Sequence, residues 1–327
     1  MNDTIHRLSI SFIIPVLNGE KFMAQCVEHI ITEMREGDEL IVVDNGSTDA
    51  TLDIVRRYDR ARILEYPDST IAFLRNRGVE VAHGDLYAFI DSDVIICKGW
   101  RAAVESVIGD ESIHATGSKY DIPEKPHWIE RAWYSKRSKG LRPINYINSG
   151  NLIVRRAAFE AVGGFNEKLV TDEDCDLGER LNRDGYAVVE APLIRAIHLG
   201  NPKSLWNFFK KEKWHATSSL NSLSQGVFDK PTVMTIAFMA CLASVLATLP
   251  WVLSGQLNPL IFPALLLLVP LVTAVYRCYQ FRAIRHILAF VVLYFVFYIA
   301  RALIILQFLF ERTLKRAFFG RQSGKVR

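Results

Sequence analysis

The sequence predicts an α/β domain with a mostly parallel sheet, followed by an all-helical membrane region. The first observation is that five apolar, strand-like runs occur before residue 121, mostly separated by helical patterns, as in βαβ units. The second is that no charged residue occurs between Pro231 and Tyr276. A helix needs about 20 apolar residues to cross a bilayer, so this stretch is long enough for two spans.

The strand-like runs explain why a parallel sheet is expected. They lie near residues 9–16, 39–44, 62–66, 86–91 and 113–120. Runs that are almost continuously apolar are typical of strands buried on both faces, as they are when helices cover a parallel sheet. The second run ends in Asp44-Asn45-Gly46, a strong turn signal, and Ser47, Thr48 or Asp49 can cap the helix that follows.

The fourth run ends in Asp91-Ser92-Asp93. Two carboxylates at the rim of a sheet cost several kcal/mol each if they are buried without a partner. A divalent cation removes that cost, and carboxylate oxygens suit Mg²⁺ or Mn²⁺. Open α/β sheets also bind their ligands at the carboxyl ends of strands. The residues therefore indicate a metal site, with a helix cap at Ser92 or Asp93 as the alternative.

A second group of acids opens a helix that we expect to run to Arg183. Its members are Asp172, Glu173, Asp174 and Asp176. Repulsion between neighbouring carboxylates raises the pKa of one of them, which is useful for a group that must accept a proton. The alternative is that these acids only favour the positive end of the helix.

The chain resembles the family 2 glycosyltransferases over residues 8–200. The resemblance rests on motifs that occur in the family's order, namely residues 15–20 (PVLNGE), 44–49 (DNGSTD), 75–78 (RNRG), 91–93 (DSD), 163–167 (GGFNE) and 173–174 (ED). It implies a GT-A fold, a nucleotide-sugar donor with a UDP-sugar expected first, and inversion at the anomeric carbon.

The resemblance also implies roles for the acidic residues. Asp174 matches the catalytic base of the family's Glu-Asp pair, and Glu173 lies on the acceptor side. Asp93, assisted by Asp91, would hold a divalent cation that bridges the two phosphates and neutralises charge as the bond breaks. His198 would complete the metal site or touch the diphosphate. The alternative for His198 is a hydrogen-bonded core or loop histidine.

Seven residues are assigned to the donor side by resemblance: Pro15, Asn18, Glu20, Asp44, Asn45, Arg75 and Asp91. Asp44 would accept a hydrogen bond from the ring nitrogen of the nucleobase. An Asx turn explains Asp44 equally well, and both roles are compatible. Arg75 could reach the base or a phosphate, and a solvated surface arginine is its alternative.

The acceptor side is expected along residues 148–151, where Gly150 permits close backbone approach and Asn151 follows it. A loop entering a strand explains the same residues. Lys213-Trp214 is similar to the Arg-Trp ending of processive synthases and is placed on the acceptor side too. Lys210 stands where those enzymes have glutamine, so processive polymer synthesis is not indicated.

The domain organisation follows from these patterns. We expect a transferase domain over residues 1–200, an amphipathic interfacial segment over 201–230, and a basic tail over 311–327. Membrane helices are expected within 231–310, at about 233–253, 259–276 and 287–310. Aromatic residues mixed with lysines, as in 201–225, are typical of a helix lying in a membrane interface. An ordinary amphipathic domain helix is the alternative.

Charge predicts which side of the membrane each part faces. From residue 233 onward the chain has ten Lys and Arg against one Glu, which leaves 29 basic and 34 acidic residues in the preceding part. That acidic balance argues against nucleic-acid binding by the head. The arginine-containing loop 277–286 is expected in the cytoplasm and the uncharged turn 254–258 outside. The head is then cytoplasmic, on a multi-pass protein of the inner membrane.

Length predicts three full spans, but the charge of the tail conflicts with that number. Three spans would leave the basic tail outside, against the same charge rule. Either the third stretch lies in the interface or re-enters, with Arg301 reaching headgroups, or the rule is overridden.

The polar segment Met1–Arg7 predicts no cleavable signal peptide. Five scattered cysteines at 26, 97, 175, 241 and 278 are consistent with a reducing cytosol.

The function expected from the sequence is a membrane-anchored inverting glycosyltransferase that acts on a lipid-linked acceptor or a cell-surface glycan precursor. A polyprenyl-phosphate glycosyltransferase is one alternative. A non-catalytic membrane scaffold with a degenerate transferase head is another. The acidic set of Asp44, Asp91, Asp93 and Asp174 is complete, which argues against degeneracy.

Overall fold

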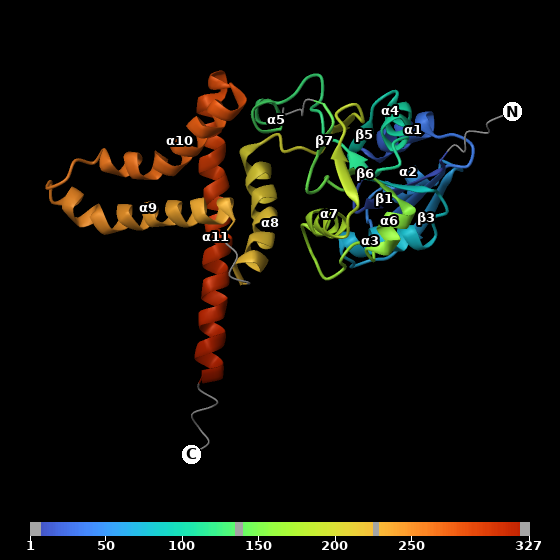
Figure 1. The fold of residues 1–327 in the computed structure, drawn as a ribbon. Coiled ribbons are helices and arrows are strands. Elements are labelled where there is room, and N and C mark those ends of the chain that lie inside the picture. The colour runs from blue at the N-terminus through green and yellow to red at the C-terminus, as the bar shows by residue number, and fades with distance from the viewer. Residues whose placement is uncertain (1–7, 135–139, 225–228, 321–327) are drawn as a thin grey trace, which may run out of the picture. The chain divides into compact units, whose positions relative to one another are not determined.

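The computed structural model describes residues 8–134, 140–224 and 229–320. The chain forms two compact units, drawn in Figure 1. The first contains the residues up to 125 together with 134–201. The second contains residues 126–133 and the residues from 202 onward. The short excursion at 126–133 was not expected from the sequence, which assigned all of 1–200 to one domain.

The first unit is built on an eight-stranded sheet with the order β3-β2-β1-β4-β8-β6-β9-β7. The pairs β3-β2, β2-β1, β1-β4 and β6-β9 are parallel, whereas β8 runs antiparallel to β4 and β6, and β7 to β9. The mostly parallel sheet predicted from the sequence is confirmed. The strands are β1 (Ile10–Val16), β2 (Glu39–Asp44), β3 (Ala61–Glu65), β4 (Leu86–Ile90), β6 (Ile113–Gly117), β7 (Arg142–Pro143), β8 (Asn151–Arg155) and β9 (Ala187–Glu190).

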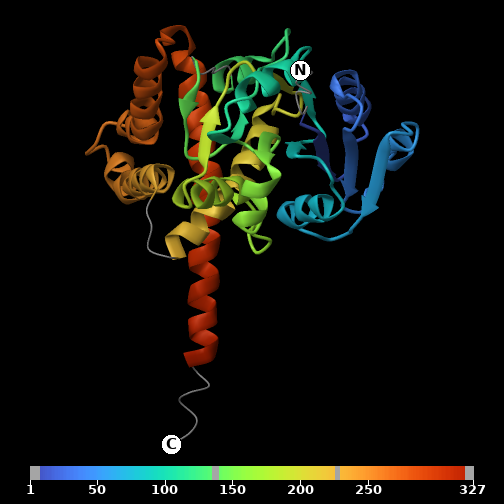
Figure 2. The same ribbon diagram turned by 45° about the vertical axis from the view of Figure 1, so that its right-hand side comes forward.

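Helices cover both faces of this sheet, which is why its central strands are apolar throughout. In β1, Phe12 and Ile14 belong to the core on one face and Ile13 to the core on the other. The strand layer lies between helices in Figure 2. The first face packs against α1 (Met23–Glu33) and α4 (Trp100–Ile108), and the second against α3 (Ile71–Glu80), α6 (Arg156–Ala161) and α7 (Glu173–Arg183).

Three short elements complete the first unit. The strands β5 (Val94–Ile96) and β10 (Ala196–His198) form a separate antiparallel pair in which Val94 lies opposite His198. The helix α2 (Thr51–Val55) follows β2. The β5–β10 pair brings His198 beside the end of β4, more than 100 residues earlier in the chain, which only the folded structure specifies.

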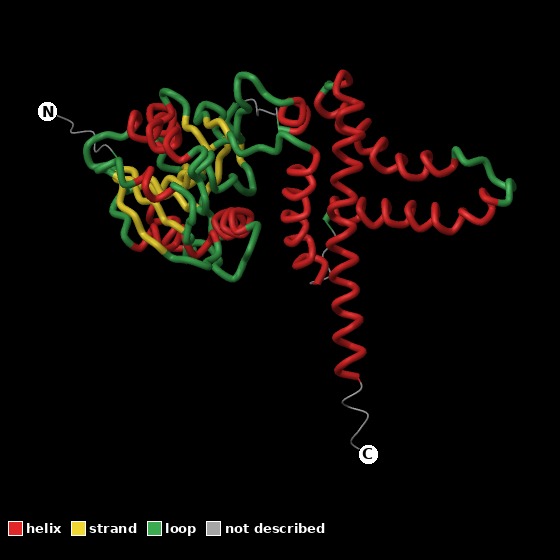
Figure 3. The backbone as a smooth tube through the Cα atoms, turned by 180° about the vertical axis from the view of Figure 1, so that it is seen from behind, coloured by secondary structure: helices red, strands yellow, loops and turns green. Residues whose placement is uncertain are grey.

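The second unit is helical, and Figure 3 shows it as helices joined by loops. Its helix α8 lies alongside α11. The helices α9 and α10 form a hairpin in which α9 and the first part of α10 run crosswise to α11, and the last part of α10 turns to run beside α11 (Figures 1 and 3). A 3₁₀ turn at Ile284–His286 leads into α11. The helices are α5 (Trp128–Trp133), α8 (Leu205–Ser224), α9 (Lys230–Leu253), α10 (Ile261–Phe281) and α11 (Ile287–Gly320).

Within the described residues, three helical stretches are long and apolar enough to cross a membrane: Lys230–Leu253, Ile261–Phe281 and Ile284–Glu311. Their positions agree with the apolar stretches expected from the sequence. Arg301 of α11 lies 3.7 Å from the Glu212 carboxylate of α8 and stacks 4.4 Å from the Phe297 ring centroid. It therefore faces α8, in contrast to the role at lipid headgroups that the sequence allowed.

Candidate active site

The first unit gathers its polar side chains at the carboxyl ends of β1, β2 and β4. Arg75 of α3 lies at the centre, and its side chain is only 1% exposed. Its Nη2 is 2.8 Å from Asp91 Oδ1 and its Nη1 is 2.6 Å from Glu173 Oε1. Both guanidinium arms are thus held by carboxylates. The interpretation of Arg75 as a solvated surface arginine is wrong, and a direct contact with the donor stays a prediction.

Asp174 lies in the first turn of α7, directly after Glu173. Its Oδ1 accepts a hydrogen bond from the backbone N–H of Cys175 at 2.8 Å, and its Oδ2 one from Ser149 at 3.3 Å. Burial raises the pKa of Asp174 to about 6, the charge of Glu173 adds to the rise, and Arg75 partly opposes it. The repulsion expected from the sequence contributes, but burial is the larger cause.

Asp93 and His198 lie next to each other at the start of β5 and the end of β10. His198 Nε2 is 3.6 Å from Asp93 Oδ2. Two glycines admit backbone close to the carboxylates: a Cβ at Gly150 would overlap Asp91, and one at Gly200 would overlap Asp93. Gly150 thus has the close approach that the sequence predicted for it.

This set fits a divalent cation. Asp91 and Asp93 supply hard oxygen atoms and His198 an imidazole nitrogen, a combination that Mn²⁺ accepts and Mg²⁺ tolerates. In the described parts of the chain, no three His, Cys, Asp or Glu side chains are close enough together to hold a metal ion by themselves. Magnesium in phosphate-transferring sites takes only one or two protein carboxylates and completes its shell with phosphates and water. Two carboxylates and one imidazole are sufficient for that arrangement.

Asp44 ends β2 and is fully buried. Its Oδ2 accepts hydrogen bonds from the backbone N–H groups of Gly46 and Ser47, both at 2.8 Å. The Asx turn expected from the sequence is therefore present. Asp44 Oδ1 is buried without a hydrogen-bond partner. A buried acceptor of this kind is costly unless a ligand supplies a donor.

The remaining donor-side residues build the loops around Asp44. Asn18 and Glu20, after β1, each accept a hydrogen bond from the backbone of the loop after β2, at 2.9 and 3.1 Å. Asn45 exchanges two hydrogen bonds with the Ser69 backbone. Pro15 is buried within β1. These contacts shape the site, and direct contacts of these side chains with a donor stay predictions.

Three of the predicted acceptor-side residues show no contact with the carboxylates in the described parts of the chain. Asn151 is fully buried, with its Oδ1 accepting from Trp100 Nε1 at 3.0 Å and its Nδ2 donating to Ser118 Oγ at 3.1 Å. These contacts give Asn151 a packing role. Lys213 and Trp214 lie on α8, in the second unit. An acceptor role for these three residues stays a prediction.

Sequence reasoning missed Tyr120. Its ring centroid lies 5.0 Å from that of His198, and its hydroxyl lies where a side chain on Gly150 would be. Burial and the charges of Asp91 and Asp93 raise its pKa well above the usual value, so the phenol stays protonated and can donate a hydrogen bond. Tyr120 follows the end of β6 without any motif, so no local signal could have identified it.

The amino-acid sequence is similar to two glycosyltransferase family models and to several known glycosyltransferases. Residues 11–163 match the sequence model of Glycosyl transferase family 2, and residues 145–306 match that of Glycosyl transferase family group 2. Glycosyltransferase AglE of Haloferax volcanii is 27% identical over 205 residues, covering 59% of this chain and 67% of that protein. Pre-mycofactocin glycosyltransferase of Mycobacterium tuberculosis is 30% identical over 210 residues, covering 59% of this chain and 43% of that protein.

Among solved structures, the mannosyltransferase PcManGT from Pyrobaculum calidifontis, in complex with GDP-Man and Mn²⁺, has a TM-score of 0.62. The likeness covers 91% of this chain and 87% of that one, at 16% sequence identity. At that identity the comparison shows the fold alone. The GT-A fold expected from the sequence is confirmed.

Proposed function

The chain belongs to the family 2 glycosyltransferases, and on that premise we propose that it is an inverting transferase at a membrane. It moves a sugar from a nucleoside-diphosphate donor to a lipid-linked acceptor or a glycan precursor. The observation that carries this proposal is the cluster of Asp91, Glu173 and Asp174 around Arg75 at the carboxyl edge of the sheet, with the Asp93–His198 pair, whose Asp93 closely follows Asp91 in the chain.

The donor side is served by Asp44, Asp93 and His198. The orphaned Oδ1 of Asp44 accepts an N–H of the nucleobase, which restores its missing hydrogen bond. Asp93 and His198, with Asp91, would hold a divalent cation, which when bound would neutralise the charge that develops on the leaving diphosphate. The Pyrobaculum mannosyltransferase was solved with GDP-Man and Mn²⁺, which supports a divalent ion. A UDP-sugar is the first donor to test.

Asp174 is the proposed base. The acceptor hydroxyl oxygen attacks the anomeric carbon from the face opposite the diphosphate, and its proton passes to Asp174. The bond from the anomeric carbon to the diphosphate oxygen breaks, and the nucleoside diphosphate leaves with the electron pair. A pKa of about 6 leaves Asp174 ionised at neutral pH yet basic enough to take the proton.

The experiment that tests the proposal uses membranes containing the full-length protein. They are incubated with labelled UDP-, GDP- and dTDP-sugars, and the lipid extract and soluble glycans are analysed for label. Transfer that depends on Asp174 supports the proposal. A protein that binds nucleotide but transfers no sugar from any donor supports the scaffold alternative instead.

We also propose the orientation. The head and residues 277–286, which comprise the end of α10 and the 3₁₀ turn, are cytoplasmic, and the α9–α10 hairpin spans the inner membrane with its uncharged turn outside. α9 and the first part of α10 run crosswise to α11. If these helices cross the membrane, α11 therefore lies along the membrane surface. This arrangement keeps the basic tail inside, which removes the conflict that three full spans create.

Single cysteines in a cysteine-free background test this orientation, with an impermeant thiol reagent on intact cells. We expect labelling at Gln256→Cys and protection at Gln280→Cys and Glu311→Cys. Labelling of Glu311→Cys would mean that α11 crosses the membrane as a third span. Labelling of Gln280→Cys but not Gln256→Cys would reverse the whole orientation.

A further inference from the structure

A cavity of about 130 Å³ opens at the carboxyl ends of β6 and β9. Since β8 is antiparallel to both β4 and β6, these ends lie on the same edge of the sheet as Asp91. The function described above does not use this cavity. The residues that line it include Ser118, Lys119, Ile144, Tyr146, Asn148 and Glu190.

One wall of the cavity is continuous with the catalytic base. This wall is the arch, residues 144–150, which leads from the edge of the sheet to the start of β8. Asn182 of α7 donates a hydrogen bond to the carbonyl of Asn145 at 3.0 Å. The helix that carries the base is thus hydrogen-bonded to the arch. Further along the arch, Ser149 N–H donates to Asp174 Oδ2 at 3.3 Å. The arch therefore joins the lining of the cavity to the base, since Asn148 lines the cavity and the next residue, Ser149, contacts Asp174.

The lining suits a hydroxyl-rich ring. Lys119 and Asn148 are exposed polar side chains, and the Tyr146 ring is 40% exposed. Glu190 is buried and is neutralised by Arg142, whose Nε and Nη2 lie 2.6 and 2.5 Å from its Oε2. The cavity thus combines donors, acceptors and an aromatic face without a strong surplus of charge. Sugar hydroxyls need paired donors and acceptors, and the faces of sugar rings pack on aromatic rings.

The size sets a limit on the ligand. A water molecule takes about 30 Å³ of liquid volume, so the cavity holds roughly four water-sized groups, or one small ring. Complete ligand sites are typically about 300–1,000 Å³, so this cavity is a subsite for one part of a larger molecule.

Resting on the proposed function, we infer that this cavity binds a sugar residue of the acceptor. The acceptor is then a saccharide, free or carried on a lipid, and not a bare polyprenyl phosphate. A polyprenyl phosphate would need an apolar channel and a surplus of cations at its head. Here Lys119 is accompanied by the Glu190–Arg142 pair, and the side chains of Asn148 and Tyr146 are polar.

The test compares two classes of acceptor with the full-length protein in a detergent that contains no sugar. The probes are a panel of p-nitrophenyl glycosides and citronellyl phosphate, with the donor identified in the membrane assay. We expect transfer to at least one glycoside and none to citronellyl phosphate. Tyr146→Ala and Asn148→Ala should each raise the KM for that glycoside about 10-fold, while the KM for donor and the affinity for nucleotide stay unchanged.

Two further variants sharpen the result. Tyr146→Phe keeps the ring and should retain most of the affinity for the glycoside. Leu141→Ala is the matched control, because Leu141 is exposed in the same segment but does not line the cavity. Its acceptor KM should equal that of the unmodified protein.

Three outcomes are distinguishable. Transfer to citronellyl phosphate alone would overturn the inference while leaving the transferase function intact. So would transfer to a glycoside whose KM is the same in Tyr146→Ala, Asn148→Ala and Leu141→Ala. Absence of transfer from every donor in the membrane assay itself would overturn the proposed function, and the inference with it.

Discussion

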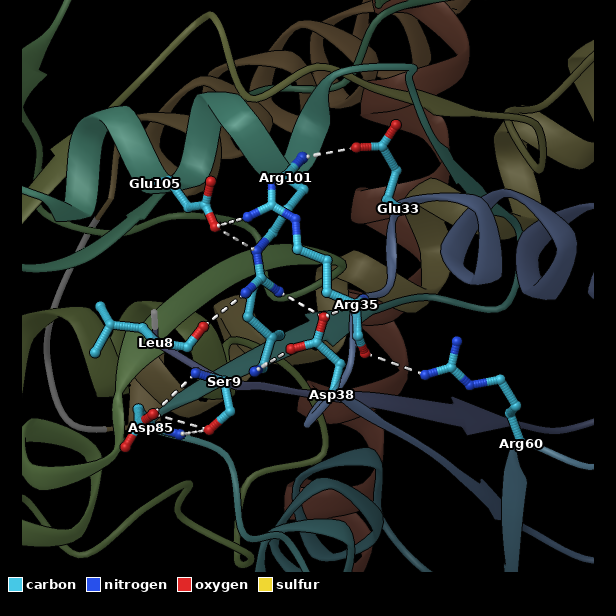
Figure 4. A network of polar contacts seen from close by, with 10 residues as sticks. Leu8, Ser9, Glu33, Arg35, Asp38, Arg60, Asp85, Arg101 and Glu105 are labelled. Carbon is cyan, nitrogen blue, oxygen red and sulfur yellow. Dashed lines mark hydrogen bonds and ion pairs between the residues drawn. The ribbon is translucent and has the colours of Figure 1, made fainter. Parts of the chain in front are cut away.

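The two ends of the same sheet each bury an arginine among carboxylates, but the balance of charge differs between them. At the amino end, shown in Figure 4, Arg101 lies 2.6 Å from Asp38 Oδ2 and 3.1 Å from Glu105 Oε1, and Arg35 also pairs with Glu105. Two cations therefore meet two carboxylates. At the carboxyl end, Arg75 contacts Asp91 and Glu173.

The difference lies in what remains after these pairs are made. Both carboxylate oxygens of Asp38 are hydrogen-bonded within the protein. Its Oδ1 accepts from Ile10 N–H at 2.7 Å and its Oδ2 from Arg35 N–H at 2.8 Å. At the carboxyl end, Asp174 is a third carboxylate near Arg75, and Asp93 lies beside His198. A balanced buried network holds the fold together, whereas one with surplus negative charge needs a ligand cation. The five predictions below test this distinction.

The largest effect is expected from removing Asp93. Asp93→Ala should lower divalent-dependent turnover about 10³-fold or more, because a catalytic metal supplies several kcal/mol and about 1.4 kcal/mol corresponds to a factor of ten. Initial rates with Mn²⁺ and with chelator measure the loss. The thermal unfolding midpoint of the variant should not fall. Near-normal turnover of the unmodified protein in the presence of chelator would contradict the assignment of Asp93 as a metal ligand.

Asp174→Asn keeps the size of the side chain but removes the proton acceptor. It should bind the donor normally and lose about 10²–10⁴-fold in turnover. In the unmodified protein, turnover should fall as the pH drops through about 6, because the base becomes protonated. A collapse of donor affinity with high residual turnover would instead make Asp174 a donor-site or structural residue.

The same substitution should act on stability in the opposite direction. The pKa of Asp174 is raised in the folded state, so its favourable contribution is present below about pH 4 and is lost as the pH rises through about 6. Asp174→Asn should therefore unfold at a higher temperature than the unmodified protein at pH 7.5, and the difference should shrink at pH 4. Calorimetry at both pH values measures it.

A smaller effect is expected from His198→Ala. As a metal ligand or close metal partner, His198 should contribute about 10–100-fold to metal affinity. Turnover of the variant should recover at high Mn²⁺, which a titration of rate against metal concentration reveals. A core histidine would instead show an unchanged metal dependence and a lower unfolding temperature.

The smallest effect on turnover is expected at the amino end. Arg101→Ala leaves Asp38 buried without its cation and should cost about 3–5 kcal/mol in the free energy of unfolding, measured with denaturant. The folded fraction should keep its turnover per molecule, because this cluster lies at the end of the sheet away from the site. Arg75→Ala is the contrasting variant and should reduce turnover. Loss of turnover in folded Arg101→Ala would remove the distinction between the two clusters.

The sequence by itself determined the strands, the order of the motifs and the apolar helices. Period and composition decide these features locally: continuous apolar runs become buried strands, and uncharged stretches of 20 or more residues become candidate spans. The carboxylates Asp91, Asp93 and Asp174 could also be identified locally, because each stands at the end of a strand or the start of a helix.

Only the tertiary structure decided how these parts meet. Arg75 and Glu173 are 98 positions apart, and Tyr120 reaches the site without a motif. The order β1-β4-β8-β6 places strands side by side that are not neighbours in the chain, so the contacts across them have no local signature. The same reason explains why Asn151 became a buried packing residue and why residues 126–133 joined the helical unit.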